Sequence, residues 1–97
     1  MAHWLLTYDL APDYLDRRPA FRDEHLTLAR EAAARGDLLL GGALDPPEQA
    51  MLLFQGDTPA AAEGFAAADP YVANGLIARW TVRQWITVVG KGAASPL

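Results

Sequence analysis

The order of strand-like and helix-like segments constrains the fold of this chain more than any other feature of its sequence. Short apolar runs rich in β-favouring residues predict strands, and stretches with helical spacing of apolar residues predict helices. The expected strands are residues 3–8, 37–44, 50–55 and 76–89, and the expected helices are residues 19–35 and 58–68. This order, βαββαβ, is that of the ferredoxin-like split βαβ arrangement. We therefore predict an α+β fold in which two helices cover one face of a four-stranded antiparallel sheet.

Local residue signals set the ends of these segments. Pro19 is suited to the first turn of the first helix, and Gly36 to the position after its last turn. Thr58 and Pro59 are typical of the N-cap and the first turn of the second helix. The Asp-Pro-Pro-Glu linker of residues 45–48 predicts a hairpin between the two middle strands. We expect residues 90–97 to form a flexible tail.

The length and the apolar content predict a single domain that forms a homodimer. A length of 97 residues suits a single domain, and 52% of the residues are hydrophobic. The two middle strands carry apolar residues on both faces, as antiparallel strands normally do only when both faces are covered. A homodimer would cover the face that the helices leave bare. The last strand would span about 45 Å at about 3.3 Å per residue, which implies bending, a bulge or pairing across a dimer.

The composition excludes several classes of partner and site. With 8 Lys and Arg against 12 Asp and Glu, the net charge of −4 repels a phosphate backbone, so we expect no nucleic-acid partner. No apolar run approaches the about 20 residues that a membrane-spanning helix needs. The first ten residues carry no basic leader or cleavage site, so we expect a cytoplasmic protein. The absence of cysteine excludes disulfides, thiolate metal sites and cysteine nucleophiles.

The remaining residue types predict neither a metal nor a cofactor. The two histidines, His3 and His25, lie on different segments and form no HxH or HxxxH pair. The glycines form neither a GxGxxG fingerprint nor a P-loop, so we expect no nucleotide cofactor. The only serine, Ser95, lies in the tail and outside any GxSxG motif. The chemistry left to the chain is that of imidazole, carboxylate, hydroxyl and guanidinium groups.

The first helix carries polar groups on its apolar side. At about 100° per residue, its apolar residues form one arc that has His25 near the middle and Arg22 within it. The apolar members are Phe21, Leu26, Leu28, Ala29, Ala32 and Ala33. A buried polar group without a partner costs about 1 to 3 kcal/mol, so acidic or backbone partners must lie nearby. Two interpretations stay open: a hydrogen-bonded core histidine with Arg22 reaching to the edge, or a functional pair.

Asp69 is the carboxylate that we consider for a site. It opens residues 69–75, between the second helix and the last strand, where a loop can present functional groups. The residues alone favour a structural role, because Asp69 before Pro70, with Gly75 a few residues later, is typical of the frame of a short helical turn.

Three short motifs occur in the order found in a known family. They are Arg22-x-x-His25-Leu26, the Gly-Gly-Ala-Leu of residues 41–44, and the Asp-Pro-Tyr-x-x-x-Gly-Leu of residues 69–76. With them the chain resembles the YciI-like (YCII-related) family over nearly its whole length. The resemblance implies a ferredoxin-like dimer of the dimeric α+β barrel group, related to muconolactone isomerases. It also implies an acid/base pair, which falls here on His25 and Asp69.

The implied pair is chemically reasonable, and other polar residues are candidates for the same site. An aspartate that accepts one imidazole N–H fixes the tautomer and leaves the other nitrogen to move a proton. Arg22 would then hold a substrate carboxylate, although a structural salt bridge explains it equally well. Tyr8 and Tyr71 are candidate phenolic donors to the cleft, or packing residues.

Glycine at the end of the second strand offers a further candidate contact. The absence of side chains at residues 41–42 would let a ligand approach the backbone, and we take Gly42 as the candidate substrate contact. A β-bulge is the alternative explanation of this glycine pair.

Three hypotheses of function follow. The first is a cofactor-free enzyme that acts on a small anionic organic molecule by proton transfer, as a lactone isomerase, dehalogenase or lyase. The second is a non-catalytic dimeric module that binds a small ligand or another protein. The third is a cofactor-free monooxygenase, which oxygen uptake would reveal. A His25 ring that borders an open cleft favours an enzyme, whereas one sealed by Phe21, Leu28 and Ala32 favours the module.

Overall fold

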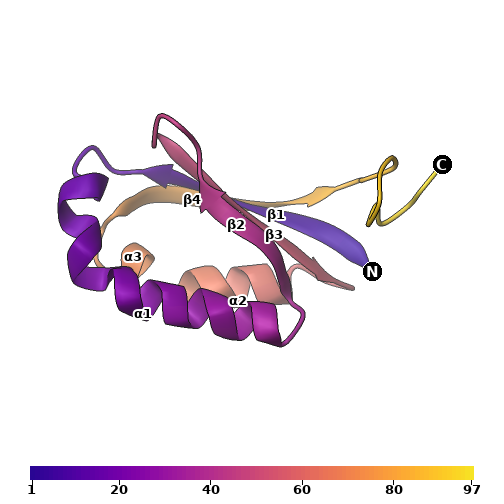
Figure 1. Ribbon diagram of the computed structural model, residues 1–97, viewed down its shortest axis with the longest axis horizontal. Coiled ribbons are helices and arrows are strands. Elements are labelled where there is room, and N and C mark those ends of the chain that lie inside the picture. The colour runs from indigo at the N-terminus through magenta and orange to yellow at the C-terminus, as the bar shows by residue number, and fades with distance from the viewer.

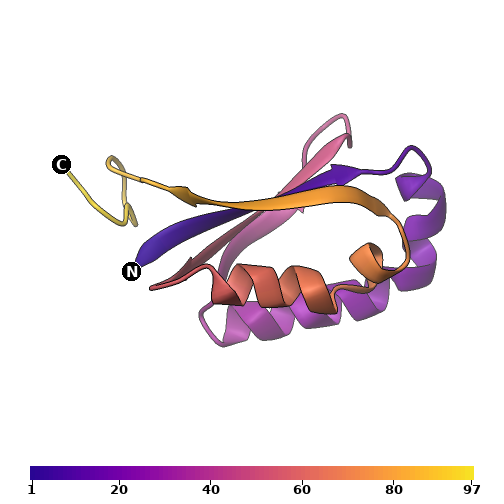
Figure 2. The same cartoon turned by 180° about the vertical axis from the view of Figure 1, so that it is seen from behind.

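The sheet and the two long helices follow the predicted order. The computed structural model describes all 97 residues. Its elements are β1 (Ala2–Leu10), α1 (Tyr14–Ala34), β2 (Leu38–Ala43), β3 (Gln49–Gly56), α2 (Ala60–Ala68), α3 (Pro70–Ala73) and β4 (Ile77–Trp85). All strand pairs are antiparallel, in the order β2-β3-β1-β4. Both long helices lie on one face of the sheet (Figures 1 and 2), so the predicted ferredoxin-like α+β fold is confirmed.

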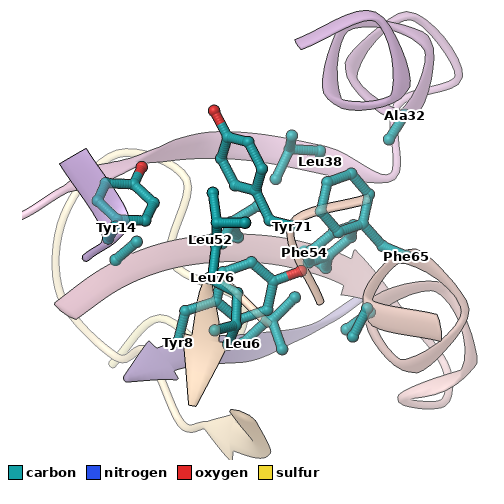
Figure 3. Close-up of a cluster of buried hydrophobic side chains, with 14 residues drawn as sticks. Leu6, Tyr8, Tyr14, Ala32, Leu38, Leu52, Phe54, Phe65, Tyr71 and Leu76 are labelled. Atoms are coloured by element: carbon teal, nitrogen blue, oxygen red, sulfur yellow. The ribbon is translucent and has the colours of Figure 1, made fainter. Parts of the chain in front are cut away.

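The strand register separates an inner face, turned to the helices, from an outer face. In the register of the central strand β1, Leu6 lies opposite Leu52 and Val82. Residues of this row are buried against α1 and α2, as Figure 3 shows for the aromatic and aliphatic core. The alternate row, which includes Leu5 opposite Leu53, belongs to the outer face. The helices leave this second apolar row uncovered.

Helix α1 begins five residues before the predicted start. It starts at Tyr14, so Pro19 lies inside the helix and not in its first turn. Proline removes one helical N–H and normally bends a helix, and Figure 1 shows the first turns of α1 at an angle to the rest. The buried ring of Tyr14 explains the extension, because the core holds the segment before the proline in place. None of the helices has the length and apolar character needed to cross a membrane.

Strand β4 is shorter than predicted. It ends at Trp85, whereas the expected strand reached residue 89. Trp85 pairs with His3, and β1 begins one residue earlier, at Ala2, so residues 87–89 lie beyond the start of β1 and have no part of it beside them. The β1–β4 register shifts between Asp9 and Leu10, which is one of the irregularities that the predicted length implied.

The C-terminal tail folds back on the residues that follow β4. The backbone N–H groups of Ser95 and Leu97 donate to the carbonyls of Thr87 and Val88, each at 2.9 Å. The Thr87 hydroxyl bonds the Nδ1 of the buried His3 at 2.8 Å. Figure 2 shows the tail lying beyond the end of the sheet, away from the helices. Its predicted flexibility stays a prediction.

Candidate functional site

Asp69 is a fully buried carboxylate with three hydrogen-bond donors. It lies between α2 and α3 and is 0% exposed. Oδ1 accepts the Tyr71 backbone N–H at 3.0 Å, and Oδ2 accepts the Tyr8 hydroxyl at 2.7 Å. His25 Nδ1 lies 2.9 Å from Oδ1 and 3.0 Å from Oδ2. A buried charge needs such partners, and Asp69 is therefore both the cap of α3 and the partner of His25.

The contact with Asp69 assigns the tautomer of His25. An ionised carboxylate only accepts hydrogen bonds, so Nδ1 carries a proton, and in the neutral form of the ring Nε2 keeps its lone pair. No protein group bonds Nε2, and no buried side-chain polar atom lacks a partner, so Nε2 reaches accessible space. The predicted meeting of His25 and Asp69, 44 positions apart in sequence, is confirmed.

Two aromatic rings fix the plane of the imidazole. Tyr71 stacks on His25 with ring centroids 3.9 Å apart and planes 7° apart. Phe65 meets the imidazole at 77°, with ring centroids 6.1 Å apart. The His25 side chain is 15% exposed and borders a cavity, so the ring is not sealed by Phe21, Leu28 and Ala32.

The Tyr8 hydroxyl holds the carboxylate. Tyr8 is 1% exposed, and its single hydroxyl proton goes to Asp69. Burial, and then the charge of Asp69, raise the pKa of Tyr8 well above its ordinary value. Tyr8 therefore stays protonated and continues to donate its hydroxyl hydrogen bond to Asp69, although its ring lines the cavity.

Tyr71 offers a hydroxyl without a protein partner. Burial is the main cause that raises the pKa of Tyr71 to about 12, and the charges of Arg22 and Arg18 act in the opposite direction. The edge of Tyr14 packs on the Tyr71 ring at 87°, with centroids 5.7 Å apart. Figure 3 shows the Tyr71 hydroxyl pointing away from the Tyr8 hydroxyl. Tyr71 is therefore a neutral donor that borders the cavity.

A cavity of about 300 Å³ lies between α1 and the inner face of the sheet, next to the edge strand β2. Apolar residues form 13 of its 19 lining positions. Five of the six predicted site residues line it, and the sixth, Asp69, lies behind His25. The five are Tyr8, Arg22, His25, Gly42 and Tyr71. This size is at the lower end for a small-molecule pocket.

Three lining residues with polar groups were not predicted as site residues: Tyr14, Arg18 and Arg30. They belong with Arg22 and Leu26 to one row at four-residue spacing along α1, and such rows lie on one side of a helix. This periodicity was the available signal, but the expected helix began after Tyr14 and Arg18. Arg30 lay within the expected helix but outside its apolar arc, and the cavity lining corrects that placement. Arg22 has no carboxylate within salt-bridge distance, so the alternative of a structural salt bridge is wrong.

The two glycines of β2 have different orientations. Gly41 pairs with the inner-face residue Leu52, whereas Gly42 pairs with the outer-face residue Met51. The missing side chain that opens the pocket floor is therefore that of Gly41, and Gly42 lines the cavity through its backbone. The register shift in β2 falls between Leu38 and Leu40, so a bulge does not explain the glycine pair.

The structure contains no group of three or more His, Cys, Asp or Glu side chains that could hold a metal ion. The expected absence of a metal and a cofactor stays a prediction.

Comparisons with known proteins agree on the fold. A family model described as the YCII-related domain matches residues 1–86. The 5-chloro-2-hydroxyhydroquinone dehydrochlorinase of Burkholderia phenoliruptrix, solved with 2,5-dihydroxybenzoquinone, is 21% identical, with a TM-score of 0.71 and coverage of 86% of this chain and 92% of that chain. A NIPSNAP family protein of Agrobacterium tumefaciens is 18% identical, with a TM-score of 0.59 and coverage of 90% and 92%.

An antibiotic biosynthesis monooxygenase is also similar, at 14% identity, with a TM-score of 0.57 and coverage of 92% of this chain and 100% of that chain. No curated protein sequence matches the chain. At these identities the solved structures show the ferredoxin-like fold alone, since one fold hosts many activities.

Proposed function

Because the chain belongs to the YCII-related domain family, we propose that it is a cofactor-free enzyme that moves a proton on a small anionic organic molecule. One observation carries the proposal. The His25 ring is held by a buried carboxylate through Nδ1 and by a stacked tyrosine, while Nε2 has no protein partner beside a cavity. An imidazole positioned in this way is suited to general acid/base catalysis.

His25 is the proton carrier in this proposal. Nε2 takes a proton from an acidic C–H or O–H group of the substrate, and the charge of Asp69 stabilises the imidazolium that forms. Nε2 then returns the proton to a different atom of the substrate or to water. Tyr8 and the Tyr71 backbone N–H keep Asp69 in place throughout, so the ring does not turn when its charge changes.

The reaction type that we favour is the loss of HCl from a chlorinated substrate, with lactone isomerisation as the alternative. One solved relative in fold is named a dehydrochlorinase. In such a step a base takes a proton and chloride leaves with the electron pair of the C–Cl bond. The step needs only the base, a site for the substrate anion and a hydroxyl donor. His25, Arg22 and Tyr71 supply these groups.

The proposal is tested by supplying 5-chloro-2-hydroxyhydroquinone and a chlorinated muconolactone to the wild type and to His25→Asn. We expect chloride release with the wild type, exchange of a substrate hydrogen in D₂O, and loss of both with the variant. Oxygen consumption is recorded in the same samples. Turnover that survives in His25→Asn contradicts the proposal. Stoichiometric oxygen uptake identifies a monooxygenase, and binding without turnover identifies a binding module.

We also propose that the protein works as a homodimer joined through the outer face. Leu40 and Trp85 are 72% and 50% exposed, and Leu40 pairs with Leu53, next to Leu5. Soluble monomers rarely expose a contiguous apolar row of this kind. A second copy offers the same row, as a two-fold symmetric interface requires.

A further inference from the structure

The wall of the pocket is positively charged in a chain that is negatively charged overall. The net charge of the protein is −4. The 19 lining residues nevertheless include three arginines and no aspartate or glutamate. All three, Arg18, Arg22 and Arg30, come from α1.

These three guanidinium groups lack carboxylate partners. Elsewhere in the chain, arginines do find them: Arg17 pairs with Asp13, Arg35 with Asp37 and Arg79 with Asp9. Like charges four residues apart on a helix repel one another, so Arg18 and Arg22 destabilise α1 slightly unless an anion lies between them. The pocket arginines are therefore available for an anionic ligand.

Arg18 and Arg22 form one positive end of the pocket. The Arg18 guanidinium lies 5.6 Å from the centroid of the Tyr14 ring, a cation–π contact that holds it beside Tyr71. Both arginine charges act on the Tyr71 hydroxyl, where they oppose the rise in pKa that burial causes. A ligand anion here would meet two guanidinium groups and a phenol.

Arg30 forms the other end. It follows Arg22 by eight residues, which is about 12 Å along the helix axis at about 1.5 Å per residue. Between the two ends the pocket wall is apolar apart from His25, with Leu26 and Ala29 on α1 and Leu52 across from them.

We infer that the pocket binds an organic ligand with negative charge at two separated positions, one held by Arg18 and Arg22 and the other by Arg30. The apolar body of the ligand lies over Gly41, next to Nε2 of His25. Only the placement beside Nε2 rests on the proposed function. The two-ended charge recognition rests on the arginines alone, and it deepens the proposal of an anionic substrate.

Binding of two matched pairs of probes tests this inference. Terephthalate and adipate carry a carboxylate at each end, and their monomethyl esters keep the size but lose one charge. We measure Kd by isothermal titration calorimetry at fixed, low salt. Each dianion is expected to bind about tenfold tighter than its ester, because the second carboxylate adds a charged hydrogen bond, and such a bond changes affinity by about this factor.

Variants assign each charge to its partner. Arg30→Gln should remove the preference for the dianion, and Arg22→Gln should weaken binding of dianion and ester together. Arg35→Gln is the control, because Arg35 caps the C-terminal end of α1 and does not line the pocket. It should change neither the affinity for the dianion nor that for the ester. Thermal unfolding of each variant verifies its fold. Equal or absent binding of dianion and ester in the wild type overturns the inference, as does a preference that survives in Arg30→Gln.

The test also separates this inference from the proposed function. His25→Asn should keep the preference for the dianion, because the variant removes the proton carrier and none of the arginines. A wild type that prefers dianions but turns over no substrate defeats the enzyme proposal alone. Turnover that depends on His25, with no preference for dianions, defeats the two-charge inference alone.

Discussion

Tyr71 holds both members of the His25–Asp69 pair. Its ring stacks on the imidazole at a centroid distance of 3.9 Å, and its backbone N–H donates to Asp69 Oδ1 at 3.0 Å. A single residue of α3 therefore fixes the plane of the ring and the position of the carboxylate. Any change that moves α3 will alter the geometry of both groups together.

His25→Asn should be a mild change for the fold. Asp69 loses one of its three donors and keeps the Tyr8 hydroxyl and the Tyr71 N–H. We expect a loss of about 1 kcal/mol in the free energy of unfolding, which lowers Tm by about 4 to 8 °C in a domain of this size. Thermal unfolding followed by circular dichroism measures it. A loss of about 3 kcal/mol or more would instead mark a histidine whose main role is structural.

Stability should fall steeply above pH 10. The folded-state pKa of Tyr71 is about 12, against 10.0 unfolded, and the pKa of Tyr8 is also raised. Between these values the unfolded chain has lost a proton that the folded chain still binds, so the free energy of unfolding decreases as pH rises. Each tyrosine contributes up to about 1.4 kcal/mol per pH unit.

Urea unfolding of the wild type and of Tyr71→Phe, followed from pH 8 to pH 11, tests this prediction. The variant lacks the titrating phenol but keeps the ring, so the decline above pH 10 should be shallower. Equal slopes in both proteins would show that Tyr71 does not titrate differently on unfolding.

The two glycines of β2 should respond differently to alanine. A Cβ at Gly41 would lie 3.5 Å from Leu52 Cγ, an ordinary contact, and would fill the pocket floor. A Cβ at Gly42 would meet nothing within 4 Å. We expect Gly41→Ala to weaken terephthalate binding and Gly42→Ala to leave it unchanged. Neither should lower Tm, because alanine reduces the entropy of the unfolded chain. Equal binding by both variants would contradict the proposed floor.

Sedimentation should give the mass of a dimer. We expect about 21 kDa, twice the 10.5 kDa of one chain. Leu53→Glu places a charge on the outer face. It should produce a monomer with unchanged circular dichroism, because an unpaired charge buried in the interface would strongly destabilise the dimer. Leu15→Glu, at an exposed position of α1, is the matched control. A wild type that stays monomeric at high micromolar concentration contradicts the proposal.

Local sequence patterns predicted the order of the elements, because helical spacing and turn residues lie within short segments. The His25–Asp69 contact joins residues 44 positions apart, and it was predicted only through the resemblance to the YciI-like family. The start of α1 could not be predicted in this way. It depends on Tyr14 packing against Tyr71, a contact between residues far apart in sequence, which outweighs the cost of Pro19 inside the helix. Arg18 was missed for the same reason. The end of β4 depends on where β1 begins.

The N–H of Tyr71 offers a direct readout of the site in the free protein. Most buried amides of a helix exchange with solvent when their helix opens, but this amide is held by the side chain of Asp69. Its hydrogen exchange therefore follows the carboxylate. A single backbone resonance can report when the imidazole and carboxylate separate, before any substrate is identified.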